Sequence, residues 1–153
     1  MIYSKIKYGI SVYGLATTMY LNKIQILQNQ LLKVLLNKKY RYPTNRLHNE
    51  MGILKVEDII EQELCSFVHN YLSSNLPESF SGYFRPFSEV HSIDTRGSNK
   101  LQLPKPNKEI GKNTVKFKGS SIWNSQTDKK RNIKNPKTFR KSFKKNKLPY
   151  DLT

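Results

Sequence analysis

Apolar residues recur at three- and four-residue steps between Tyr20 and Lys38, a spacing that places them on one face of a helix. The members of this apolar stripe are Leu21, Ile24, Leu27, Leu31, Val34 and Leu35. The intervening positions form a polar face and hold Asn22, Lys23, Gln25, Gln28, Asn29, Gln30 and Lys33. The pattern predicts an amphipathic helix over residues 20–38, with its apolar stripe covered by the flanking segments and its polar face in water.

The segment before this helix, Ile2 to Leu15, mixes aromatic and aliphatic residues. Its β-branched and Tyr content is typical of a strand, whereas apolar positions 2, 6, 10 and 13 fit a helical period. We favour a helix with Gly14 near its C-terminal end, paired with the helix from Tyr20 as an antiparallel hairpin.

Two further helices are predicted. Residues 57–73 repeat apolar side chains with the helical period, and Glu57 and Asp58 occupy the first turn, where the helix dipole favours acids. Residues 136–147 place Phe139 and Phe143 one turn apart among lysines and arginines. The alternation Val115-Lys-Phe-Lys predicts a short strand. The expected fold is therefore mostly α, with a helical hairpin, a further long helix, a few short strands in the C-terminal half and a basic C-terminal helix.

The charge is distributed unevenly along the 153 residues, which carry a net charge of +16. Residues 96–153 contain seventeen Lys and Arg against three Asp and Glu. We expect a helical core over residues 1–95 and a basic, loop-rich arm over residues 96–153. A segment this basic attracts polyanions, so the expected partner is RNA or DNA.

Several classes of protein are disfavoured. There is one cysteine, Cys65, which excludes an internal disulfide and a cysteine-rich zinc site, and the histidines His48, His69 and His91 lie far apart. We expect no metal and no cofactor. No apolar run approaches the ~18–20 residues of a membrane span, and the start has no secretory signal pattern. The sequence thus favours an intracellular protein without a membrane partner and leaves nucleus and cytoplasm open.

Candidate nucleic-acid-binding residues cluster in three places. They are Lys38, Lys39 and Arg41 in a connector, Arg96 with Lys116, Lys118 and Trp123, and Lys129, Lys130, Arg131, Lys137, Arg140, Lys141, Lys144 and Lys145 near the end. Lysine- and arginine-rich helices follow phosphate backbones. Trp123 can stack on an unpaired base, although a lone Trp more often anchors a core, as a His such as His69 also does. For the connector and Arg96, phosphate contact and a purely structural role stay open.

Short motifs in a fixed order also link the chain to a known family. The matching positions are Tyr8-Gly9-Ile10, Tyr13-Gly14, Leu27-Gln28-Asn29, Leu31-Leu32-Lys33-Val34, Thr44-Asn45, Leu47, Ile53-Leu54-Lys55-Val56, Asp58-Ile59, Phe67-Val68-His69-Asn70, Leu76-Pro77, Phe80, His91, Thr95-Arg96, Phe117-Lys118-Gly119, Ile122-Trp123-Asn124 and Lys141-Ser142-Phe143-Lys144. In this order the chain resembles the C-terminal region of non-LTR, jockey-like retrotransposon reverse transcriptases, downstream of the catalytic palm. Ser125-Gln126-Thr127, where the family often has Leu-Pro, and Ile93, where it often has an aromatic residue, depart from the pattern.

The resemblance implies a fragment of an RNA-directed DNA polymerase of a transposable element. The catalytic aspartates of such enzymes lie upstream, and this chain has no Asp-Asp pair. Two-metal nucleotidyl transfer needs converging carboxylates, so we expect no catalytic activity from the chain alone. The expected partners are RNA or DNA and the upstream polymerase region. A stand-alone RNA- or DNA-binding module and an inert remnant of a decayed element are the alternatives. The preferred nucleic acid, any sequence specificity, the oligomeric state and independent folding stay open.

Overall fold

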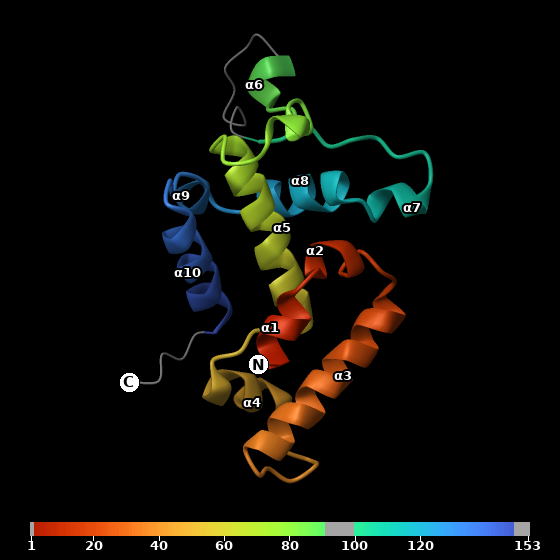
Figure 1. The fold of residues 1–153 in the computed structure, drawn as a ribbon, viewed down its shortest axis with the longest axis vertical. Coiled ribbons are helices and arrows are strands. Elements are labelled where there is room, and N and C mark those ends of the chain that lie inside the picture. Colours follow the sequence, from red (N-terminus) through yellow and green to blue (C-terminus); the bar gives the residue numbers. More distant parts are fainter. Residues whose placement is uncertain (1, 91–99, 149–153) are drawn as a thin grey trace. The chain divides into compact units, whose positions relative to one another are not determined.

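The computed structural model describes residues 2–90 and 100–148, and these residues form helices joined by turns and connectors (Figure 1). The elements in chain order are α1 (Ile2–Lys7), α2 (Ile10–Tyr13), α3 (Thr18–Leu35), α4 (Thr44–Met51), α5 (Val56–Leu72), the 3-10 turn η1 (Glu78–Phe80), α6 (Phe87–Val90), α7 (Glu109–Lys112), α8 (Val115–Ser125), α9 (Asp128–Arg131) and α10 (Pro136–Lys147). The mostly-α class expected from the sequence is confirmed.

The predicted strands are wrong for the described residues, which contain no strand. The nearest approach is an isolated antiparallel bridge between Pro86 and Leu101. Val115–Lys118, the predicted strand, is the first turn of α8, and the Thr114 hydroxyl accepts a hydrogen bond from the Phe117 N–H at 3.2 Å. This N-cap satisfies a helical donor, and the helix buries Gly119, Ser120 and Trp123 one turn further on. Capping and burial therefore outweigh the alternation of four residues.

The N-terminal segment forms two short helices instead of one. Gly9 separates α1 from α2 with a φ of +68°, a left-handed conformation that is open to glycine at no steric cost. The following helix, α3, confirms that a helix lies in the range predicted at residues 20–38, but it begins at Thr18 and ends at Leu35. Its main packing partner in the fold is α4, so the predicted hairpin with residues 2–15 is not its principal contact.

The chain folds into two compact units. One contains residues 1–60 and 141–153, and the other contains residues 61–140. The buried apolar side chains of the first unit are Ile10, Leu32, Leu47, Leu54, Val56, Ile59, Ile60 and Phe143, and those of the second are Leu64, Cys65, Val68, Phe84, Leu101, Trp123 and Phe139. The predicted boundary at residues 95–96 lies outside the described residues and stays a prediction.

The face of α3 that packs inward is not the face that the pattern predicted. Gln28 and Leu32 are 2% and 3% exposed, whereas Leu27 and Val34 of the predicted stripe are 58% and 78% exposed. The expectation that flanking segments cover this stripe is therefore wrong for Leu27, Leu31, Val34 and Leu35.

Hydrogen bonds to a neighbouring connector explain this orientation of α3. The Gln28 side-chain amide donates to the Leu54 carbonyl at 2.9 Å, and Gln25 Oε1 accepts the Val56 N–H at 2.8 Å. Val56 opens α5, and the first N–H groups of a helix have no partner within the helix. Gln25 supplies the acceptor for one of these N–H groups, and Gln28 supplies the donor for the Leu54 carbonyl, which an apolar face cannot do.

Candidate nucleic-acid interface

Helix α10 has a defined start and a buried aromatic face. The Asn135 side-chain oxygen accepts hydrogen bonds from the N–H groups of Lys137, at 2.9 Å, and Thr138, at 3.3 Å. Pro136 occupies the first helical position, where its missing N–H costs nothing. Phe139 and Phe143 are 0% and 1% exposed, so their common face of the helix is fixed against protein.

The opposite face of α10 carries a row of exposed lysines. Lys137, Lys141 and Lys144 follow each other at steps of four and three residues, and Lys145 lies beside them. All four side chains are exposed, and we call them the cationic stripe. At 1.5 Å of rise per residue, Lys137 and Lys144 are about 10 Å apart along the helix axis. The stripe thus presents four ammonium groups to solvent along one helix.

Two other cations of α10 are used within the fold. Arg140 pairs with Glu63 at 2.9 Å and donates to the Ser66 hydroxyl at 3.3 Å. Lys147 pairs with Asp58 at 2.9 Å. Of the four predicted binding residues from Arg140 to Lys145, the structure leaves the three lysines on the open face and commits Arg140 to a structural ion pair.

The Lys129-Lys130-Arg131 cluster is split in the same way. The Arg131 side chain is 6% exposed, pairs with Asp128 and donates to the Asn124 carbonyl at 3.3 Å. Lys130 donates to the Gln126 side chain at 3.1 Å, and Lys129 is exposed. Arg131 therefore ties α9 to the end of α8 instead of facing solvent.

In the connector after α3, Lys38 forms an ion pair with Glu50. The Lys38 Nζ lies 3.3 Å from Glu50 Oε2 and 4.6 Å from the centre of the Tyr42 ring. The hydrogen bond with Glu50 raises the pKa of Lys38, and the hydrogen bond donated by Tyr42 is the main cause of the lowered pKa of Glu50. Lys39 and Arg41 are exposed.

The remaining candidates differ in accessibility. Trp123 is 3% exposed and its ring centre lies 6.0 Å from that of Phe139, so it packs in a core, the alternative that the sequence favoured. Lys116 and Lys118 are half-buried, and the Lys116 ammonium group lies 5.5 Å from the Tyr83 ring centre. Arg96 lies outside the described residues.

His69 is a core residue, as the sequence indicated. It is 3% exposed, its Nε2 lies 2.5 Å from the Ile133 carbonyl oxygen, and its ring stacks on Phe139 with the centres 4.6 Å apart. In the part of the chain that the structure describes, no group of three or more His, Cys, Asp or Glu residues is arranged to hold a metal ion.

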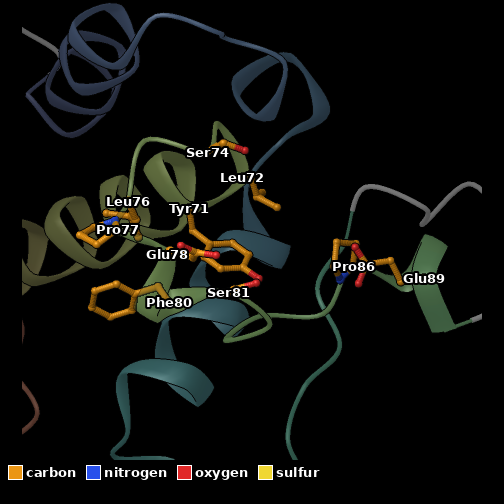
Figure 2. A pocket seen from close by; sticks show the side chains of 10 residues that line it. All are labelled: Tyr71, Leu72, Ser74, Leu76, Pro77, Glu78, Phe80, Ser81, Pro86 and Glu89. Atoms are coloured by element: carbon orange, nitrogen blue, oxygen red, sulfur yellow. The ribbon is translucent and has the colours of Figure 1, made fainter.

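A cavity of about 400 Å³ lies in the unit formed by residues 61–140. Figure 2 shows its lining side chains, with Pro86 and Glu89 set apart from the group around Tyr71. The Tyr71 hydroxyl donates to the Phe84 carbonyl at 2.9 Å, and the charged residues that line the cavity are the acids Glu78 and Glu89. These carboxylates repel phosphate, so the cavity does not extend the cationic surface.

Comparisons with known proteins return no match to a family model, to a curated protein or to a solved structure. Within residues 2–90 and 100–148, no helix has the length and apolar character that crossing a bilayer requires.

Proposed function

We propose that this chain binds the phosphate backbone of a nucleic acid through the cationic stripe of α10. The observation that carries this proposal is the division of α10 into a buried face, with Phe139 and Phe143, and an exposed face with Lys137, Lys141, Lys144 and Lys145. The net charge of +16 supports it, because attraction of this size concentrates a polyanion at the surface.

The chemistry of the stripe favours backbone contact over base reading. A lysine ammonium group is a compact point charge with rotatable donors, whereas base recognition relies on the planar, bidentate geometry of Arg, Asn or Gln. Phosphate contacts fix position and carry no sequence information. The expected binding is thus strongly dependent on salt and only weakly dependent on sequence.

A titration series at different salt concentrations tests the proposal. The variant K141Q/K144Q/K145Q removes three charges from the exposed face of α10 and leaves Phe139 and Phe143 in place. Each lost phosphate contact lowers the slope of log K against log salt by about 0.7 on single strands and about 0.9 on duplex, so we expect a slope shallower by about two to three. The measurement is fluorescence anisotropy with labelled single-stranded RNA and with duplex DNA.

A matched control separates this helix from bulk charge. Lys5, Lys100 and Lys105 are exposed lysines outside α10, and K5Q/K100Q/K105Q makes the same change in net charge. We expect the control to retain most of the wild-type slope. A slope in the α10 variant equal to that of the wild type contradicts the proposal. The proposal is also contradicted if the α10 variant and the control reduce the slope by the same amount.

We further propose that the chain is the C-terminal, non-catalytic region of a non-LTR retrotransposon reverse transcriptase. The ordered motifs support this family, and the stripe supports a role in holding RNA or DNA for the upstream polymerase. Sequencing of the locus and transcript upstream of the Met1 codon tests it. Continuous in-frame coding with a Tyr-x-Asp-Asp motif is the expected result, and stop codons or unrelated sequence there contradict it.

A further inference from the structure

Helix α3 presents an unpartnered apolar face with a regular repeat. Tyr20, Ile24, Leu27, Leu31 and Val34 follow each other at alternating steps of four and three residues, and we call these five residues the apolar seam. Steps of this kind average 3.5 residues, the repeat with which one helix packs along another. Tyr20 is 55% exposed, Leu27 58%, Leu31 42% and Val34 78%, while Ile24 is half-buried.

The seam is large enough for a protein partner. Leu35, at its border, is 59% exposed. A fully exposed large apolar side chain presents about 200 Å², so the exposed fractions of the seam residues and Leu35 correspond to roughly 600 Å² of apolar surface. This area is at the upper end of the range for the largest apolar patch on a typical monomer. One partner in a standard interface contributes ~800 Å² including its polar rim, so the seam and its polar neighbours supply about one such share.

The charge around the seam selects the kind of partner. Between Thr18 and Leu35 the helix contains Lys23 and Lys33 and no acidic residue. Lys23 is exposed and lies one residue before Ile24, at the border of the seam, and Lys39 and Arg41 are exposed in the connector that follows. The net charge of +16 repels a second copy of the chain and attracts an anionic partner.

We propose that α3 docks an acidic amphipathic helix of a protein partner along the apolar seam. The partner helix packs its own row of apolar residues against Leu27, Leu31 and Val34 and carries Asp or Glu at the flanking positions opposite Lys23. In such pairs the flanking charges determine which partner is accepted, while the apolar row provides most of the contact area.

Two synthetic peptides of 21 residues test the proposal with the full chain. Both have Leu at every apolar position of the seven-residue repeat, and they differ in the flanking positions, which are Glu in one and Lys in the other. Fluorescence anisotropy measures the binding of each labelled peptide. We expect the Glu peptide to bind at least tenfold more tightly than the Lys peptide, and K23Q to reduce this preference.

Neutral substitutions on α3 distinguish the seam from simple charge attraction. L31Q/V34Q changes two exposed side chains of the seam without changing the charge, so the fold is retained and binding of the Glu peptide falls at least tenfold. Ile26 is 55% exposed on the same helix but lies outside the seam, and I26Q leaves binding unchanged. Circular dichroism verifies the helix content of each variant.

The following outcomes overturn the proposal. Equal affinities for the two peptides show that charge does not select the partner. If the L31Q/V34Q variant still binds the Glu peptide, the peptide binds elsewhere on the chain, for example on the cationic stripe. If analytical ultracentrifugation shows a dimer of the wild type and a monomer of L31Q/V34Q, the seam binds a second copy of the chain. Binding to vesicles of phosphatidylcholine and phosphatidylserine that depends on Leu31, without peptide binding, assigns it to a lipid surface. None of these outcomes affects the test of α10.

Discussion

Two neighbouring residues of α3, Leu27 and Gln28, test which face of this helix is buried. The apolar pattern places Leu27 in a core and Gln28 in water, whereas the structure exposes Leu27 by 58% and Gln28 by 2%. The substitutions L27A and Q28A therefore have opposite expected effects under the two orientations. Alanine is a good helix former, so neither change breaks the helix itself.

The expected magnitudes follow from the contacts of each side chain. Q28A removes the hydrogen bond to the Leu54 carbonyl and leaves that buried acceptor without its partner, which costs about 1–3 kcal/mol. L27A changes an exposed side chain and alters stability by less than about 0.5 kcal/mol. If Leu27 were in a core, the same change would cost about 2–5 kcal/mol.

Hydrogen–deuterium exchange of peptides from residues 18–35 measures this difference locally. A cost of about 2 kcal/mol corresponds to roughly 30-fold faster exchange, because each 1.4 kcal/mol is a factor of ten. We expect that acceleration for Q28A and wild-type exchange for L27A. Faster exchange in L27A than in Q28A refutes the orientation of α3, and with it the apolar seam.

Two further predictions concern buried titratable groups. Burial lowers the pKa of His48 and outweighs the hydrogen bond to the Ile53 carbonyl, which raises it, so the folded state favours the neutral ring. The unfolded chain binds the proton more readily, so the stability that His48 contributes is complete above its ordinary pKa of about 6.5 and is lost as pH falls through the lowered value. The protection factors of the α3 and α4 amides, which correct for the intrinsic pH dependence of exchange, should thus fall below pH ~6.5. H48Q should remove part of this dependence, and identical pH profiles would contradict the assignment. Burial also raises the pKa of the Cys65 thiol to about 12. A thiol reagent at pH 8 should therefore react with Cys65 only after denaturant is added. Rapid reaction in the native state would contradict this prediction and show that the site opens.

The candidate site was predictable from the sequence where the signal was local. The two phenylalanines of α10 stand one turn apart, and Lys or Arg occupies most of the other positions. The exposure of Lys141, Lys144 and Lys145 therefore follows from the helical period alone. The structural roles of Arg140 and Arg131 did not follow from the helical period. Their partners Glu63 and Asn124 are set by the fold, and Glu63 lies 77 residues away from Arg140 in the chain.

By itself the sequence determined the helical class, the approximate ranges of α3, α5 and α10 and the basic C-terminal region, because these depend on periodicity, charge and capping within a few residues. The tertiary structure decided which face of α3 is buried and that residues 115–118 are helical. Gln25 and Gln28 form hydrogen bonds with Val56 and Leu54, about thirty residues further along the chain. A pattern of apolar positions cannot predict such hydrogen bonds. The physical reason is that buried backbone groups must be paired, and only the fold determines which side chains reach them.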